Sequence, residues 1–238
     1  GLGDVYKRQS LQSPAGEKLY VSSSLGAGTQ ELSFIFVETK VLVNYVKMER
    51  MTGKQLIYFR FFHPAAGIWK VNVSKKGISG SRFHMWLPVQ GLISPDTYFL
   101  ESTPYITVTA PGDSTRGITA TAYQYLDNSL YFQAGRGFTP NNQGTPDLAA
   151  PGVDLLIPLP GGAFGKASGS SLSSAVVAGA AALVQEWAIV RGNIPYASGN
   201  TVKFYLQKGA VREEQMEYPN PGWGYGRLDL YRTFEIIN

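Results

Sequence analysis

The chain has 238 residues, of which 44% are hydrophobic, 13% aromatic and 16% charged, a composition typical of a folded protein with a sizeable core. Cysteine is absent and only two histidines, His63 and His84, occur, which excludes a disulfide framework, a thiolate metal site and a cysteine nucleophile and argues against a histidine metal cluster. The formal net charge of +4 is spread along the chain and indicates a solvated surface rather than a nucleic-acid partner.

Residues 1–9 (GLGDVYKRQ) resemble the translated sequencing-adapter tails that occur in metagenomic gene models. They lack the basic start, the apolar run and the small-residue cleavage site of a signal peptide. We therefore interpret residues 1–9 as an artefactual tail, exclude them from the predicted fold, and expect the chain to be a piece of a longer protein.

Residues 10–103 predict an all-β jelly-roll or sandwich domain. Strand-like runs at residues 32–37 and 69–74 are separated by turns such as residues 13–16, and the second run alternates between apolar and polar side chains. Residues 83–86 are also strand-like. Because the period of two extends from residue 12 to about residue 103, we expect antiparallel strands and no helix longer than two turns.

The character of the sequence changes from residue 104 onward. Apolar runs at residues 105–109 and 118–123 precede a long Ala-rich segment at residues 171–191. Strands followed by a buried helix indicate an α/β layer. The segment predicts a helix from about Ser171 to Val190, buried on most sides and ended by Gly192 and Asn193. Its longest apolar stretch, residues 175–184, is too short to span a bilayer.

The approach to this helix, residues 161–171 (GGAFGKASGSS), is rich in glycine and serine. It is not a phosphate-binding loop, because Pro160 and Ala167 stand where that pattern needs glycine and serine or threonine. Glycine lets the backbone come close to a substrate, and a helix N-terminus offers free amides and a positive dipole end, which suit a serine nucleophile. Taken alone, such serines are more often helix caps, and this alternative concerns Ser168, Ser170 and Ser171.

The sequence after this approach, residues 169–183 (GSSLSSAVVAGAAAL), resembles the nucleophile motif G-T-S-x-A-x-P-x-V-A-G of the subtilisin-like serine peptidases. Three further segments resemble motifs of the same family in the same order: residues 132–137 (FQAGRG), 146–153 (PDLAAPGV) and 222–226 (GWGYG). The resemblance implies that residues 104–238 form the second half of a three-layer α/β catalytic domain with a parallel sheet. It also implies that Ser171 is the nucleophile of peptide-bond hydrolysis through an acyl-enzyme.

A finer resemblance concerns residues 186–193 (EWAIVRGN), which are similar to E-W-G-I-V-R-G-N of the clostridial Csp-type subgroup. That subgroup carries a jelly-roll domain inserted in its catalytic domain, and residues 10–103 stand where the insertion would end. Three positions depart from the general family pattern. Ser170 replaces threonine, Ser173 is a mild change, and Ala175 replaces proline, as the subgroup tolerates.

The family's catalytic Asp, its His in an H-G-T-H context and its oxyanion-hole Asn have no counterpart in the chain. In the family they precede the inserted domain, so the resemblance implies that they lie upstream and that the chain alone is inactive. The remaining polar candidates have structural interpretations. His63 and His84 are structural, Asp113 is a turn residue, and Asp147 and Asp154 cap or pair locally.

For the whole protein, the resemblance implies a bacterial endopeptidase that is secreted or associated with the cell envelope or spore. Protein or peptide substrates are expected, with no nucleic-acid partner, no membrane span and no cofactor required for the chemistry. Structural calcium, substrate preference and oligomeric state stay open. Two alternatives also stay open: a catalytically silent subtilase that regulates or binds a partner, and a β-sandwich binding module in which the Ala-rich helix is only structural.

Overall fold

The computed structural model describes residues 7–22, 28–50, 53–75, 83–89, 91–139 and 146–237. The chain divides into two compact units, Gly1–Asp96 and Thr97–Asn238, and the domain limits at residues 10–103 and 104–238 stay a prediction. Residues 1–6 of the predicted tail lie outside the described residues. Residues 7–9 form the first half of strand β1 (Lys7–Gln12). All three pair with residues 73–75, and Gln9 also pairs with Val21.

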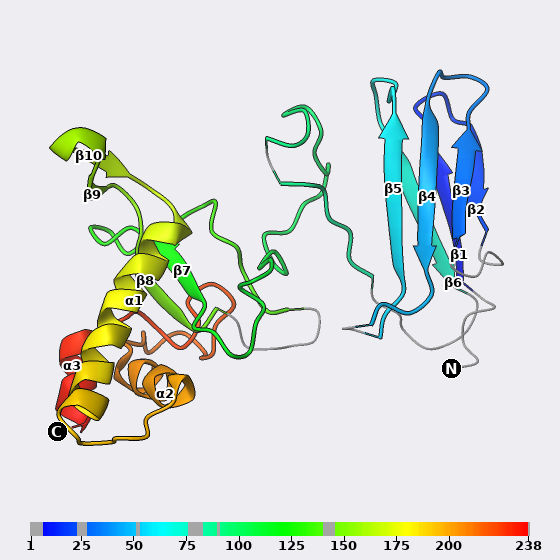
Figure 1. The fold of residues 1–238 in the computed structure, drawn as a ribbon. Coiled ribbons are helices and arrows are strands. Elements are labelled where there is room, and N and C mark those ends of the chain that lie inside the picture. Colours follow the sequence, from blue (N-terminus) through cyan, green and yellow to red (C-terminus); the bar gives the residue numbers. More distant parts are fainter. Residues whose placement is uncertain are drawn as a thin grey trace. The chain divides into compact units, whose positions relative to one another are not determined.

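Unit 1 is a sandwich of two antiparallel three-stranded sheets (Figure 1). In one sheet, β1 lies between β2 (Lys18–Val21) and β6 (Lys70–Lys75). In the other, β4 (Lys40–Val46) lies between β3 (Gly28–Ser33) and β5 (Leu56–Phe62). The described residues of this unit contain no helix, which confirms the all-β character that the period of two predicts.

One apolar face of each sheet is buried between the two sheets, because alternate side chains of a strand point to opposite faces. Trp69 packs edge-on against Phe34 and Phe61, with both ring centroids 5.1 Å from its own. The buried core consists of Leu11, Val21, Leu32, Phe34, Val41 and Val43.

Of the strands predicted in unit 1, the one at residues 32–37 is partly wrong and the one at residues 83–86 is wrong. The strand predicted at residues 32–37 ends at Ser33. The Glu17 carboxylate accepts hydrogen bonds from the backbone amides of Ile35 at 2.8 Å and Phe36 at 3.2 Å, so these amides are not available to a neighbouring strand. The described part of residues 83–103 contains no strand or helix, so the period of two ends with β6.

Unit 2 is built on a short parallel pair, β7 (Ala120–Tyr123) and β8 (Leu148–Pro151). Residues 224–228 run along the second edge of β8, where the Tyr225 amide donates to the Asp147 carbonyl at 2.8 Å and the Leu228 amide donates to the Ala149 carbonyl at 2.7 Å. A parallel sheet with helices packed against it confirms the predicted α/β fold.

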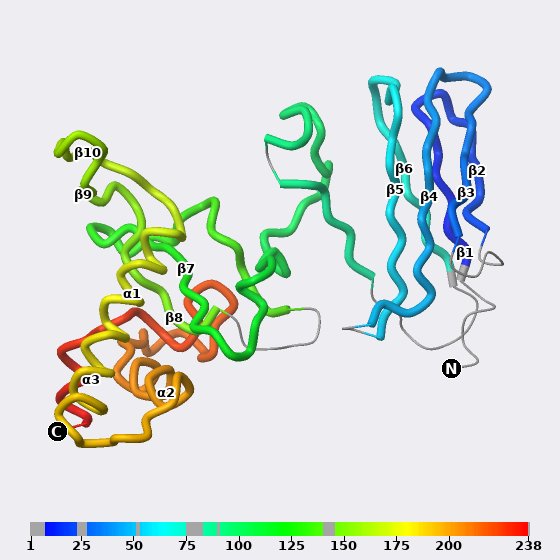
Figure 2. Tube along the Cα trace, in the orientation of Figure 1, coloured from blue at the N-terminus to red at the C-terminus, as the bar shows by residue number. Residues whose placement is uncertain are grey.

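In the described part of unit 2, three α-helices complete the fold (Figures 1 and 2). Helix α1 (Ser170–Gln185) lies against β7 and β8 and continues as one π-helical turn, Glu186–Val190. Helix α2 (Gly199–Gly209) contacts α1 and packs against α3 (Leu230–Ile237). The predicted stop is confirmed, because Gly192 has a φ of 77° and the side-chain amide of Asn193 donates to the Trp187 carbonyl at 2.8 Å.

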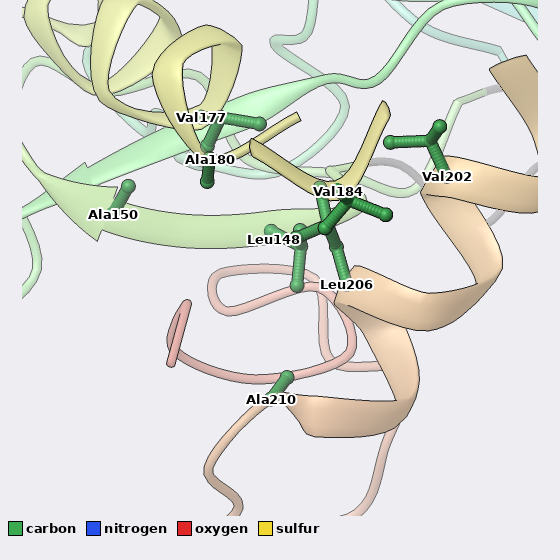
Figure 3. Packing of buried hydrophobic residues seen from close by; sticks show 8 residues of the cluster. All are labelled: Leu148, Ala150, Val177, Ala180, Val184, Val202, Leu206 and Ala210. Carbon is green, nitrogen blue, oxygen red and sulfur yellow. The ribbon is translucent and has the colours of Figure 1, made fainter. Parts of the chain in front are cut away.

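The core of unit 2 forms where α1 and α2 meet β8 (Figure 3). The side chains that α1 contributes are small or β-branched, so the helix can approach the sheet closely. The buried cluster consists of Leu148, Ala150, Val177, Ala180, Val184, Val202, Leu206 and Ala210.

The prediction that the helix is buried on most sides is wrong. The buried residues of α1 are Ser173, Val177, Ala180 and Val184, whose spacing of three or four residues defines a single face. The segment Ser170–Val190 has 21 residues and, by length and composition, could cross a membrane, whereas residues 175–184 alone could not. A helix in the core of a folded domain meets the same two criteria.

Candidate functional site

Ser171 is the second residue of α1, and its side chain is exposed. The helix is preceded by Gly169, and no side chain caps its first turn. The interpretation of the nearby serines as helix caps is therefore wrong. The first amides of a helix have no partner within it, and among the described residues those of Ser170 and Ser171 have no other acceptor. The positive end of the helix dipole thus lies beside the Ser171 hydroxyl.

The main chain is anchored on both sides of Ser171. Two residues before it, the Gly169 amide donates to the Gly152 carbonyl at 2.7 Å. Two residues after it, the Ser173 hydroxyl lies 3.0 Å from the Ala150 carbonyl oxygen and 3.1 Å from that of Pro151. Residues 150–152, at the end of β8, therefore hold both flanks of the turn that carries Ser171. The sequence alone marks Ser173 only as a mild departure from a motif, so this contact was not predicted.

Between β8 and α1 the chain forms a hairpin of β9 (Leu155–Pro158) and β10 (Phe164–Ala167), which includes the single 3₁₀ turn η2 (Pro160–Gly162). Its base is closed by Asp154 and Ser168. The Asp154 amide donates to the Ser168 hydroxyl at 2.9 Å, and that hydroxyl donates to the Asp154 carboxylate at 3.4 Å. Asp154 has a φ of 52°, a conformation that Asn and Asp tolerate better than most residues. The predicted local role of Asp154 is confirmed.

The four motif segments, which are far apart in the sequence, meet in unit 2. The Gly137 amide of the first segment donates to the Pro221 carbonyl at 2.8 Å, directly before the last segment. Residues 222–226 lie along β8, which belongs to the segment 146–153. β8 in turn holds the first turn of α1, which belongs to the segment 169–183. Hydrogen bonds therefore link the motif segments to one another, and the turn that carries Ser171 belongs to this network.

Asp147, at the start of β8, is buried and fully engaged. One carboxylate oxygen lies 2.7 Å from the Lys203 amine and 3.0 Å from the Gln207 amide. The other accepts the backbone amide of Thr119 at 2.8 Å. Asp147 is a structural, paired carboxylate, as predicted, but its partners are distant in the sequence rather than local, and the carboxylate fixes α2 to the sheet.

An open hollow of about 450 Å³ lies in unit 2 next to the hairpin base. Beside it, Asp127 accepts hydrogen bonds from the Ser129 amide at 2.9 Å and the Ser129 hydroxyl at 2.7 Å, and these bonds lower the pKa of Asp127. Phe132, one of the lining residues, is 80% exposed. The lining residues are Gln124, Ser129, Leu130, Tyr131, Phe132, Val153 and Ser168.

Tyr123 ends β7, and its ring centroid lies 5.6 Å from that of Trp223. Burial raises the pKa of the Tyr123 phenol above its ordinary value of 10.0, with Arg227 opposing the rise and Asp229 adding to it. The phenol is therefore neutral at physiological pH, so it cannot serve as the base that a serine nucleophile requires.

Both histidines of the chain belong to unit 1, so unit 2 contains no imidazole that could take a proton from Ser171. His63 directly follows β5, and the ring centroid of His84 lies 5.6 Å from that of Trp86. Asp113 lies in a turn, as predicted. In the part of the chain that the structure describes, no group of three or more His, Asp or Glu residues could hold a metal ion.

Comparison with protein families gives a match between residues 102–226 and the model of the subtilase family. Among solved structures, the CspB protease of Clostridium perfringens matches with a TM-score of 0.86 and 29% identity, over 98% of this chain and 50% of that chain. The chain thus spans about half the length of this relative.

Two further solved structures match a smaller part of the chain. The self-cleaved protease domain of PatA has a TM-score of 0.46 and 22% identity, over 56% of this chain and 46% of that chain. The prenylagaramide maturation protease PagA has a TM-score of 0.48 and 21% identity, over 57% of this chain and 47% of that chain. The comparison with curated proteins gives no match.

Proposed function

Since the chain belongs to the subtilase family, we propose that it supplies the nucleophile of a serine endopeptidase and that this nucleophile is Ser171. The observation that carries the proposal is the start of α1, where an exposed serine stands beside two free backbone amides. Free amides at a helix N-terminus stabilise the negative charge that develops on a carbonyl oxygen under attack. Among Ser168, Ser170 and Ser171, only the last matches the nucleophile position of the family motif.

The proposed chemistry is the two-step hydrolysis of a peptide bond. The Ser171 oxygen attacks the substrate carbonyl carbon while a histidine takes its proton and passes it to the departing amine. Water then cleaves the acyl-enzyme with the same histidine as base. The Ser171 amide donates one hydrogen bond to the oxyanion, and no metal or organic cofactor takes part.

The histidine, the aspartate that orients it and a second oxyanion donor from asparagine are proposed to belong to a longer polypeptide that includes this chain. Two observations support this: unit 2 has no histidine, and the chain spans about half of CspB protease. In this proposal residues 1–9 are an artefactual tail, residues 10–103 form an inserted β domain, and residues 104–238 complete the catalytic domain. A serine hydroxyl without its base is a poor nucleophile, so the chain alone is inactive.

Protein or peptide chains are the proposed substrates, and the hollow lined by Phe132 and Ser168 is the proposed place for one part of them. An extracellular, envelope-associated or spore-associated location follows from the family in the same way. The family match to residues 102–226 gives no support to the alternative of a sandwich module in which the Ala-rich helix is only structural.

The test is covalent labelling with a fluorophosphonate probe, which reports a serine activated by its base. We expect the full-length protein to be labelled, and Ser171→Ala to remove both labelling and proteolysis. Ser174→Ala is the matched control, because Ser174 is exposed and has no hydrogen bond among the described residues. It should label like the unchanged protein.

Two outcomes would contradict parts of the proposal. Strong labelling of the isolated chain would show that His63 or His84 activates Ser171, so no upstream histidine would be needed. No labelling of a full-length protein that carries the family's Asp and His motifs would favour the silent regulator instead.

A further inference from the structure

The hydroxyl of Ser173 is a polar group on the otherwise apolar buried face of α1. Ser173 is fully buried, although its neighbours Ser170, Ser171 and Ser174 are exposed. Its oxygen lies 3.0 Å from the Ala150 carbonyl oxygen and 3.1 Å from that of Pro151. A hydroxyl carries one proton, so it is shared between these two acceptors. A buried polar group is tolerated only with such partners.

The contact matters because of where it holds the helix. Ser173 lies two residues after Ser171, and the amide of Gly169, two residues before, donates to the Gly152 carbonyl at 2.7 Å. Gly152 is itself tied to β7, since its amide donates to the Tyr123 carbonyl at 3.1 Å. The turn that carries Ser171 is thus held at both ends by one three-residue segment of the sheet.

Other restraints on Ser171 are weak. Its own side chain has no hydrogen bond among the described residues, and no side chain caps the helix in front of it. Without the hydroxyl of residue 173, the first turn of α1 would keep the Gly169 anchor and the Asp154–Ser168 contact at its start, but no polar anchor at its end. A first turn held at one end can rotate, and a displacement of about 1 Å at a reacting atom slows catalysis as much as a hundredfold.

We propose that Ser173 is a positioning residue for Ser171: its hydroxyl locks the first turn of α1 onto residues 150 and 151 and so fixes the direction of the nucleophile and of the free amides beside it. This role rests on the proposed function of Ser171. Ser173 does not touch substrate in this assignment; it acts only through the backbone of the turn.

The test uses the full-length protein and the rate of fluorophosphonate labelling as a function of probe concentration, with all variants kept below their unfolding transitions. We expect Ser173→Ala to lower the maximal labelling rate between about tenfold and a hundredfold and to leave the half-saturating probe concentration unchanged. Ser173→Cys keeps a single heavy atom on Cβ, although sulfur is larger than oxygen, and this atom donates only weakly. The maximal labelling rate of Ser173→Cys should therefore lie between those of Ser173→Ala and the unchanged protein. Ser174→Ala, the same substitution on the exposed face, should match the unchanged protein.

The outcomes separate the two proposals. A full-length protein whose labelling is absent, or persists in Ser171→Ala, overturns the nucleophile and the positioning role together. Labelling that is lost in Ser171→Ala but unchanged per folded molecule in Ser173→Ala overturns the positioning role alone. If Ser173→Ala does not fold, Ser173→Cys decides, because an unchanged maximal rate in that variant shows that the hydroxyl only stabilises the fold.

Discussion

Gly152 and Ser173 are packed so closely that a Cβ on Gly152 would overlap the Ser173 hydroxyl. The same Cβ would lie 2.8 Å from Ala122 Cβ and 2.9 Å from the Gly169 carbonyl oxygen. Every one of these neighbours belongs to β7 or to the start of α1, so glycine at position 152 is what allows helix and sheet to meet next to Ser171.

A first prediction is that Gly152→Ala destabilises unit 2 by about 1–3 kcal/mol, the usual cost of overpacking a closed site. Gly179→Ala is the matched control, because a Cβ there meets nothing within 4 Å. That substitution in the middle of α1 should stabilise the chain by about 0.5–1 kcal/mol through helix propensity. Urea unfolding of both variants measures the difference, and equal midpoints would contradict the steric argument.

The buried ion pair at the start of β8 leads to a second prediction. Asp147→Asn removes the charge that faces the Lys203 amine at 2.7 Å and should lower the free energy of unfolding by about 3 kcal/mol. Glu186→Gln is the control, because Glu186 and Arg191 form an exposed pair that should contribute less than about 1 kcal/mol. Denaturant midpoints with unchanged m-values would report both effects. If Glu186→Gln lowered the free energy of unfolding as much as Asp147→Asn, the argument that the buried ion pair contributes more than the exposed one would be wrong.

Glu17 provides a third prediction in unit 1, because its carboxylate accepts the amides of Ile35 and Phe36. Glu17→Ala should cost about 1 kcal/mol, since two backbone donors lose a charged acceptor but can bind water instead. Hydrogen exchange resolved by residue should show loss of protection at these two amides first. The control Glu38→Ala removes an exposed carboxylate that has no hydrogen bond among the described residues, and it should change neither stability nor exchange.

A fourth prediction concerns alkaline pH and Tyr123. Because burial raises the pKa of this phenol in the folded state, the folded protein binds more protons than the unfolded chain once pH exceeds the ordinary tyrosine value of about 10. The stabilisation is therefore complete below about pH 10 and is lost as pH rises towards the folded-state pKa. At about pH 8, the unfolding temperatures of Tyr123→Phe and the unchanged chain should differ only by the effect of the lost hydroxyl on packing. Between about pH 8 and about pH 11, Tyr123→Phe should lose less stability than the unchanged chain. Parallel losses in both proteins would contradict this assignment.

Much of the molecule follows from local sequence. The alternation in residues 69–74 predicts strand β6, and the Ala-rich segment predicts a helix from about Ser171, one residue after α1 begins. Gly192 and Asn193 predict where the helical segment ends. These signals work because the period of apolar side chains, a helix start and a helix stop each depend on neighbours within a few residues.

The tertiary structure decided the rest, because it depends on contacts between distant segments. Glu17 captures the amides of Ile35 and Phe36, 18 and 19 residues away, and so ends a strand that the local pattern would continue. Ser173 could be recognised as an anchor only once α1 lay against residues 150–152. The motif segments around Ser171 are likewise linked by hydrogen bonds that form only when the chain folds. Local spacing determines elements such as β6 and α1, whereas the partner of a buried hydroxyl or carboxylate is set by packing that no single segment contains.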